Sequence, residues 1–312
     1  MLTTKKWIRQ SVASLLGVVL ILGVLGGWKP GAVDAADKYS SFKKVSVQGP
    51  VIPGLSGNKE WVPQGLAVVP GKNWVITSHY WGGSGGTATS IAITSTTTKK
   101  RIKTLYLYES STKKHTGHAG GLAVSKSNLW IASGKSVYKI PLSTLSSKKD
   151  YSNVVMKRYV LSHKASYATY AEGFLWVGEY MDGEDIGKKM CDAGPKGRVY
   201  AYRLNSKDEL DAKPKASFSW VTPDRIQGMA ITKDRAIYSQ SCGRNNSSQL
   251  LIYTRGAWGK KTSSLTMPPM SEGIALFGSQ LYTNFESGAR KYSGGSYPLK
   301  NMYIINIKKL KM

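Results

Sequence analysis

The chain has 312 residues, and 44 Lys and Arg against 18 Asp and Glu give it a formal charge of +26. An apolar fraction of 41% with 20% charged residues excludes a wholly disordered chain and a polytopic membrane protein. Two cysteines are too few for a disulfide-built miniprotein or a structural zinc site, so a basic globular protein is expected.

The N-terminus has the pattern of a bacterial secretory signal peptide. Lys5, Lys6 and Arg9 precede an uncharged run over residues 10–28, and a signal peptidase motif ends at Ala35. The alternative is an uncleaved anchor, because 19 uncharged residues can just span a bilayer. We favour cleavage, since the run contains Gly and Ser and the cleavage motif follows it closely. The sequence therefore predicts a secreted protein of a Gram-positive-type bacterium with no membrane span after cleavage.

The basic character belongs to the exported part. Without the signal peptide, residues 1–35, the remaining 36–312 hold 40 basic and 17 acidic side chains, a charge of +23. The lysines are spread over many segments, unlike the single basic groove of a nucleic-acid binder. Outside a bacterial cell the polyanions are wall polymers, phospholipid headgroups and acidic polysaccharides. We therefore expect an anionic cell-wall polymer or glycan as partner and no nucleic acid, with solubility alone as the alternative reason for the charge.

A short pattern recurs five times along residues 36–312, which we expect to form a single domain. Each copy opens with a small or polar residue and an apolar strand, and after a turn an apolar–aromatic pair begins a second strand. The opening strands are Gln64–Val68, Gly120–Val124, Ser166–Tyr170, Gln227–Ile231 and Glu272–Leu276. The second strands contain Trp74–Ile76, Leu129–Ile131, Leu175–Val177, Ile237–Tyr238 and Leu281–Tyr282.

Two further runs complete each unit. The third runs are Ser90–Thr94, Ser136–Ile140, Arg198–Leu204, Gln249–Thr254 and Asn301–Ile307, and fourth runs follow the first four units at Arg101–Leu107, Lys157–Leu161, Ala216–Trp220 and Ser263–Met267. Their Val, Ile, Tyr and Trp content and the Gly, Asn and Ser turns between them are typical of strands, and no sustained helical period appears.

Four strands per unit indicate an all-β, five-bladed β-propeller with four-stranded antiparallel blades, and six blades are the alternative. A β-sandwich does not explain the repeated sequence pairs. The fifth unit lacks a fourth strand, and Lys43–Val47 is predicted to fill that place and close the ring, because an open ring would leave a bare sheet edge. Cys191 and Cys242 fall in equivalent loops of the third and fourth units, so we expect a disulfide between them, with two buried thiols as the alternative.

The opening segments resemble those of a broad group of secreted bacterial propellers that includes the SMP-30/gluconolactonase, NHL-repeat and virginiamycin B lyase families. The segments that carry the resemblance are Gln64–Ala67, Gly120–Ala123, Gln227–Ala230, Glu272–Ala275 and Leu175–Glu179. The resemblance covers most of residues 36–312 and implies the fold far more than an activity.

In a propeller, the start of each innermost strand and the loop after each second strand lie at the same end. Gln64, Gly120, Ser166, Gln227 and Glu272 should therefore ring the central channel. Around them should lie the loops His79–Trp81, Glu179–Asp182 and Cys242–Arg244, and Glu286 with Arg290. Loops elaborated at one end of a rigid scaffold usually serve recognition. The predicted ligand-binding residues are Gln64, Tyr80, Trp81, Ser166, Tyr180, Gln227, Arg244 and Arg290.

The resemblance to SMP-30-like enzymes implies a divalent cation, Ca²⁺ or Mg²⁺, in the channel. Glu272 is the one carboxylate of the predicted ring, and Asp182 and Glu184 are the other candidate ligands. Hard cations usually need more anionic oxygen than one carboxylate with two amides. The alternative is that these polar groups bind water and backbone.

Acid–base chemistry would need a general base and a stabiliser of negative charge. The candidate catalytic residues are His79, His118, Glu179 and Glu272, and the His/Glu/His set of virginiamycin B lyase-like enzymes does not map onto this sequence. The favoured hypothesis is a cell-envelope-associated propeller that binds a glycan, peptide or protein at the channel mouth. The alternative is a metal-assisted lyase, lactonase or glycosidase at the same place.

Overall fold

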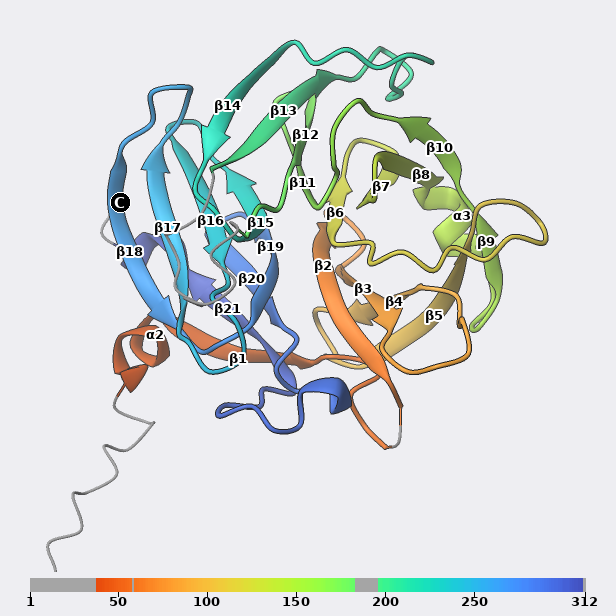
Figure 1. Ribbon diagram of the computed structural model, residues 1–312. Helices are drawn as coiled ribbons and strands as arrows, with labels where there is room; N and C mark the ends of the chain where they lie inside the picture. Colours follow the sequence, from red (N-terminus) through yellow and green to blue (C-terminus); the bar gives the residue numbers. More distant parts are fainter. Residues whose placement is uncertain (1–37, 58, 183–195, 311–312) are drawn as a thin grey trace, which may run out of the picture.

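The protein is an all-β, five-bladed propeller (Figure 1). The computed structural model describes residues 38–57, 59–182 and 196–310. Five antiparallel sheets surround the channel, as predicted. In these residues the helical elements are short, namely α2 (Ser40–Val45), α3 (Leu142–Ser147) and the 3-10 turns η1 (Arg290–Tyr292) and η2 (Ile307–Lys309).

The blades are numbered by the order of their inner strands. Blade 1 contains β2 (Trp61–Val69), β3 (Trp74–Trp81), β4 (Ser90–Ser95) and β5 (Arg101–Tyr108), and blade 2 contains β6 (Gly121–Val124), β7 (Asn128–Ser133), β8 (Ser136–Pro141) and β10 (Lys157–Val160). Blade 3 contains β11 (Tyr167–Ala171), β12 (Phe174–Gly178), β13 (Gly197–Arg203) and β14 (Phe218–Thr222). Blade 4 contains β15 (Ile226–Ile231), β16 (Arg235–Gln240), β17 (Ser248–Thr254) and β18 (Lys261–Met267). Blade 5 contains β19 (Ser271–Phe277), β20 (Gln280–Phe285), β21 (Asn301–Asn306) and β1 (Ser46–Val51).

The N-terminal strand closes the ring, but it begins later than predicted. β1 pairs antiparallel with β21 and so supplies the fourth strand of blade 5. The predicted strand Lys43–Val47 is wrong over its first three residues, which belong to α2. This helix packs Phe42 against Phe285 and Tyr303, with ring centroids 6.2 and 5.1 Å apart. Burial of one large aromatic side chain therefore overrides the alternating pattern that follows it.

The glycine of the repeat is explained by close packing of neighbouring inner strands. A Cβ atom on Gly273 would lie 2.5 Å from the backbone nitrogen of Leu66 in blade 1, and one on Gly121 would overlap the backbone of blade 3. Only glycine allows the strands to approach this closely. The third copy has Tyr167 at this position, and Gly178 opposite it leaves the room that the ring needs.

A fifth strand on blade 1 is a feature that the sequence pattern did not predict. β9 (Asn153–Val155) pairs in parallel with the outer strand β5. Its residues follow α3 in the connection between β8 and β10, so a segment of the blade 2 sequence covers the edge of blade 1. An edge covered in this way is protected from pairing with another chain.

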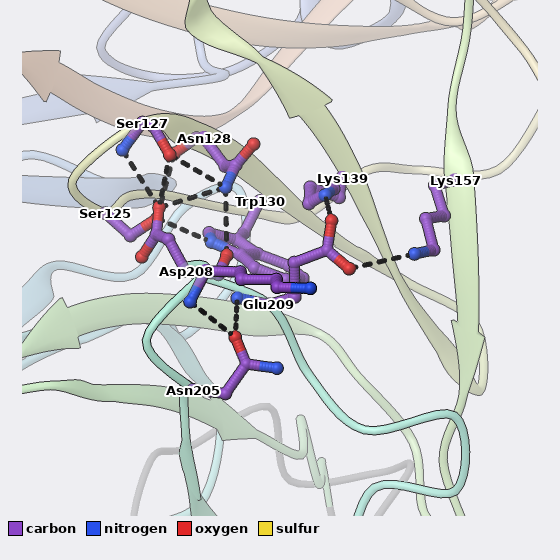
Figure 2. Close-up of polar contacts among 10 residues, drawn as sticks. Ser125, Ser127, Asn128, Trp130, Lys139, Lys157, Asn205, Asp208 and Glu209 are labelled. Atoms are coloured by element: carbon purple, nitrogen blue, oxygen red, sulfur yellow. Dashed lines mark hydrogen bonds and ion pairs between the residues drawn. The ribbon is translucent and has the colours of Figure 1, made fainter.

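A buried polar cluster joins blades 2 and 3 (Figure 2). Asp208, from the loop after β13, is 4% exposed, and its Oδ2 accepts hydrogen bonds from the Ser125 hydroxyl (2.6 Å), the Ser127 N–H (2.9 Å) and the Asn128 amide (2.9 Å). The next residue, Glu209, forms ion pairs with two lysines of blade 2. These contacts tie the loop after β13 to the turn between β6 and β7 and to β8 and β10, so we assign this cluster a structural role.

Some predictions fall on residues that the structure does not describe. Cys242 is 6% exposed, but Cys191 lies outside the described residues, so their disulfide stays a prediction. The signal peptide over residues 1–35 and the candidate metal ligand Glu184 also lie outside them. Among the described residues, no helix combines the length and hydropathy that a bilayer span needs.

Candidate functional site

The structure brings the five strand-opening residues together at one end of the channel. Gln64, Gly120, Ser166, Gln227 and Glu272 all line one cavity of about 940 Å³. Each residue lies in or directly before the inner strand of a different blade, so closure of the ring brings them together. The volume is that of a site for a small molecule or a short segment of polymer. We call this space the channel-mouth cavity.

Two glutamates of blade 5 form a hydrogen-bonded carboxyl pair in this cavity. Glu272 in β19 is 1% exposed, and its carboxyl group is hydrogen-bonded to that of Glu286, which follows β20. Burial and the neighbouring carboxylate raise the pKa of Glu272 well above its ordinary value, and burial raises the pKa of Glu286 to about 7. Glu272 Oε1 is buried and has no hydrogen-bond partner. The pair therefore retains at least one proton near neutral pH, because two carboxylates in contact repel each other.

Phenol and amide groups surround the carboxyl pair. The Gln64 amide donates to Glu286 Oε2 at 3.0 Å, and the Tyr292 hydroxyl is also hydrogen-bonded to Glu286. The Tyr292 and Tyr80 hydroxyl oxygens lie 3.2 Å apart, and the Lys291 ammonium donates to the Tyr80 hydroxyl at 3.0 Å. Burial, followed by the charge of Glu286, raises the pKa of Tyr292 above its ordinary value. The phenol consequently remains a hydrogen-bond donor at neutral pH.

His118 and Tyr180 complete this side of the cavity. The His118 ring stacks on Tyr80 with centroids 4.3 Å apart. Burial, together with the nearby charge of Lys291, lowers the pKa of His118, so the imidazole is neutral at pH 7. Burial raises the pKa of Tyr180 to about 12, with Asp182 as the next cause. We call Glu272, Glu286, Tyr80, Tyr180 and Tyr292 the acid–phenol wall.

The cavity also has a basic wall, formed by Lys114, Lys135, Arg158 and Lys164 from blade 2 and its connections to the neighbouring blades. All four side chains are exposed, and among the described residues none of them forms an ion pair. Glu109, which lines the cavity beside them, is held by Lys113 at 2.7 Å. Hydrogen bonds to that lysine and to a histidine lower the pKa of Glu109 to about 2. The basic wall therefore keeps an uncompensated positive charge.

Two of the predicted site residues line a different cavity. His79 and Trp81 come from the same strand as Tyr80, but they line a space at the outer part of blade 1. This difference follows from the alternation of a β-strand, in which neighbouring side chains point to opposite faces. The structure therefore brings Tyr80, and neither His79 nor Trp81, to the channel mouth.

Three other predicted residues are occupied elsewhere. The Arg244 guanidinium lies over the ring of Tyr292, 5.2 Å from its centroid, and Arg244 is not among the residues that line the channel-mouth cavity. Arg290 forms an ion pair with Glu60 at 3.1 Å. Glu179 follows β12 and is hydrogen-bonded to Tyr200, and it is not among the residues that line the channel-mouth cavity.

Among the described residues, the channel mouth does not bring together the several anionic oxygens that a dedicated divalent cation site needs. Within the described residues there is no group of three or more His, Cys, Asp and Glu that could hold a metal ion. Glu272 and Glu286 are joined by a hydrogen bond that requires a proton, and the Gln64 group next to them is a donor. Asp182 lies apart from them, and its backbone carbonyl accepts from the Arg225 guanidinium at 3.0 Å. Ca²⁺ prefers six to eight oxygen ligands, which this set does not offer.

The pairing of Glu286 with Glu272 is the feature of this site that the sequence did not predict. Glu286 was expected beside the channel mouth, but it was not among the candidate catalytic, ligand-binding or metal residues, and neither was Tyr292 of the same loop. Glu286 follows the second strand of its blade, as Tyr80 ends the second strand of blade 1, and this equivalence was the available signal. No sequence signal places Lys135 and Lys164 in one wall, because they are ordinary turn lysines until the blades are assembled.

The sequence matches no protein-family model and no curated protein sequence. Similar solved structures include glutaminyl cyclase from Myxococcus xanthus, with 10% identity and a TM-score of 0.50 over 83% of this chain and 94% of that chain. Another is a GH43_1 enzyme from Xanthomonas citri, with 11% identity and a TM-score of 0.49 over 86% and 92% of the two chains. Both are β-propeller enzymes, and at these identities the similarity concerns the fold alone.

Proposed function

We propose that the channel-mouth cavity binds an anionic, hydroxyl-rich ligand, namely a segment of an acidic glycan or of a phosphate-containing wall polymer. The observation that carries the proposal is the division of one cavity into a basic wall and an acid–phenol wall. Anionic groups of the ligand would lie at the basic wall. Its hydroxyl groups would exchange hydrogen bonds with protonated carboxyl, phenol and amide groups opposite.

The charge balance of the cavity supports an anionic ligand. Its lining contains five Lys and Arg side chains and three Glu side chains. Two of those three, Glu272 and Glu286, retain a proton between them, and Glu109 is paired with Lys113. The cavity therefore carries a net positive charge at neutral pH, which attracts anions and raises their rate of association.

The sequence supports the cell envelope as the place where this ligand is found. A signal peptide predicts export, and the charge of +23 on residues 36–312 would hold the protein near anionic polymer through salt-dependent attraction. In this proposal the general charge brings the protein to the envelope, and the channel-mouth cavity selects the segment that is bound.

Calorimetric titration with two soluble polymers, a polyuronate and a polyglycerol phosphate, tests the proposal and separates the two sources of negative charge. The test variant is Lys135→Ala/Lys164→Ala, and the matched control is Lys260→Ala/Lys261→Ala, which removes the same charge from exposed lysines outside this cavity. We expect the cavity variant to lose about tenfold or more in affinity and the control less than about threefold. Equal losses in the two variants would show that the net charge binds the polymer and the cavity does not.

A second candidate function, acid–base catalysis on the same class of ligand, is favoured by the carboxyl pair. Groups with strongly perturbed pKa values cluster at catalytic sites, and Glu286 has a pKa of about 7. In a uronate polymer, a base removes the proton beside the carboxylate, the glycosidic C–O bond breaks, and an acid protonates the departing oxygen. Glu286 would be the base, Glu272 the acid, and the basic wall would neutralise the carboxylate of the sugar. Glycosidase chemistry fits less well, because its two carboxyl groups stand about 5 Å or more apart.

Incubation of the protein with polyuronate distinguishes the two candidates. A lyase would generate an unsaturated sugar with strong ultraviolet absorbance, and Glu272→Gln and Glu286→Gln would remove that signal while the calorimetric affinity persists. If the absorbance of the wild-type mixture stays flat while the polymer binds, the protein is a binder of that polymer and the catalytic candidate is rejected for it.

A further inference from the structure

A second cavity lies between the outer part of blade 1 and the strand β1 that closes the ring. It has a volume of about 520 Å³, and it shares no lining residue with the channel-mouth cavity. Residues of β3, β4 and β5 form one side, and Val51 and Pro53 at the end of β1 form the other. We call it the seam cavity, and its size is in the range of sites for small ligands.

Aromatic side chains form much of its wall. The rings of Trp61 and Trp81 pack edge to face with centroids 5.0 Å apart, and the Tyr106 ring lies 6.3 Å from that of Trp61 at an angle of 30°. Trp61 is 9% exposed, whereas Trp81 and Tyr106 are partly exposed. A group of aromatic faces beside an open space is suited to stacking on the apolar face of a sugar ring.

Two unpaired cations lie at the same cavity. Lys59 and Lys99 line it, both are exposed, and among the described residues neither forms an ion pair. Arg101 differs, because Asp150 accepts both of its terminal N–H groups at 2.7 and 2.9 Å. The two lysines therefore remain available for an anionic group of a ligand.

A buried polar group of the seam cavity is a neutral histidine. His79 is 2% exposed and donates a hydrogen bond to the backbone carbonyl of Pro53. Its Nε2 is buried and has no partner, so the donating nitrogen is Nδ1 and Nε2 is an unprotonated acceptor. Burial lowers the pKa of His79 to about 3, which keeps the ring neutral. A buried acceptor without a donor costs free energy that a ligand hydroxyl could recover.

We infer that the seam cavity binds an anionic sugar residue. The sugar ring stacks on the partly exposed Trp81 beside the largely buried Trp61, its carboxylate or phosphate group lies beside Lys59 and Lys99, and one of its hydroxyl groups donates to His79 Nε2. This site is separate from the channel-mouth cavity, and it does not depend on the function proposed there. Where both cavities bind the same polymer, the second contact raises the overall affinity through its effective concentration.

The test is calorimetric titration of the full-length protein with glucuronate, glucose 6-phosphate and glucose. We expect at least one of the two anionic sugars to bind with a dissociation constant of about 1 mM and glucose to bind more weakly. The sugar that binds identifies the anionic group as a carboxylate or a phosphate. Trp81→Ala should weaken binding by about tenfold, and Lys59→Ala/Lys99→Ala should reduce the preference for the anionic sugar over glucose by about tenfold.

The controls separate this site from general surface effects. Trp258→Ala removes a tryptophan that is 93% exposed and lines neither cavity, and it should leave the affinity unchanged. Lys260→Ala/Lys261→Ala removes two exposed lysines that line neither cavity, and it should also leave the affinity unchanged. The inference is overturned if neither anionic sugar binds more tightly than glucose, or if Trp81→Ala and the double lysine variant behave like Trp258→Ala. Since the two lysines are exposed, their variant answers the question even where the tryptophan variant folds poorly.

Discussion

The carboxyl pair of blade 5 makes a sharp prediction about stability and pH. In Glu272→Gln/Glu286→Gln both carboxyl groups are replaced by amides of similar shape that do not titrate. The folded wild-type protein retains a proton on Glu286 up to pH of about 7, whereas in the unfolded chain the same group loses it near 4.5. Between these values the folded state binds more protons than the unfolded state, so the pair lowers the stability of the wild type as pH rises.

The size of this effect follows from the pKa. The rise in the pKa of Glu286 from 4.5 to about 7 corresponds to about 3 kcal/mol in the free energy of unfolding, at about 1.4 kcal/mol per pKa unit. Burial also raises the pKa of Glu272, and this group adds to the loss over the same pH range, because the unfolded chain releases its proton near pH 4.5. We therefore expect the free energy of unfolding of the wild type, minus that of the double variant, to fall by at least about 3 kcal/mol between pH 5 and 8. In a domain of this size that is a relative change in Tm of about 6–12 °C.

Urea unfolding followed by tryptophan fluorescence at several pH values measures this difference. Comparison with the variant is essential, because burial lowers the pKa of His79 to about 3 and that of His118 and His163 below the ordinary value. These histidines add stability as pH rises toward 6.5, the opposite direction, but they are present in both proteins and cancel in the difference. The reasoning is refuted if the difference between the two proteins stays within about 1 kcal/mol from pH 5 to 8.

Three further predictions concern the scaffold and the metal. Gly121→Ala should lower the free energy of unfolding by about 3 kcal/mol or more, because its Cβ would meet the backbone of blade 3. Gly294→Ala has open space around it and should leave the Tm nearly unchanged in thermal unfolding. Equal Tm values for the two variants would contradict the packing argument. Asp208→Ala should lower the free energy of unfolding by about 3 kcal/mol in urea, because it removes the acceptor of the buried donors Ser125 and Asn128 and of the Ser127 N–H. Lys157→Ala, which removes an exposed partner of the neighbouring Glu209, should cost less than about 1 kcal/mol. A small loss for Asp208→Ala would mean that water replaces the carboxylate. Millimolar Ca²⁺ or Mg²⁺ at pH 6.5 should leave the Tm of the wild type unchanged, and a rise that disappears in Glu272→Gln would show that the carboxyl pair gives up its proton to a cation.

The fold could be predicted from the sequence because the signal is repeated. Each third and fourth run that the repeat predicted is a strand, with ends shifted by at most two residues. The residues before the glycines ring the channel because the same close contact between inner strands occurs in successive blades. The errors are local. The start of β1 was misplaced because the burial of Phe42 depends on blade 5, more than 200 residues away, and β9 pairs with a strand of another blade.

The site could be predicted only in part, because some of its contacts also join residues of different blades and loops. The inner ring, Tyr80 and His118 follow from the repeat and its phase. The assignment of His79 and Trp81 to the channel did not take account of strand alternation, which turns them to the other face of blade 1. The position of Glu286 directly after β20 places it near the channel mouth, but its hydrogen bond to Glu272 appears only in the folded blade. Likewise, the basic wall exists only once blade 2 and the start of blade 3 are in place.

The central claim is that the ligand binds in the channel-mouth cavity, and hydrogen–deuterium exchange of the protein with and without the bound polymer tests it most directly. We predict slower exchange in the peptides that cover residues 113–121, 133–136 and 164–167, which carry the three lysines of the basic wall and the starts of the neighbouring inner strands. Peptides around the exposed lysines 260 and 261 should exchange at the same rate in both samples. Protection of those surface segments, with the three channel-mouth segments unchanged, would contradict the claim and leave only the net charge as the source of binding.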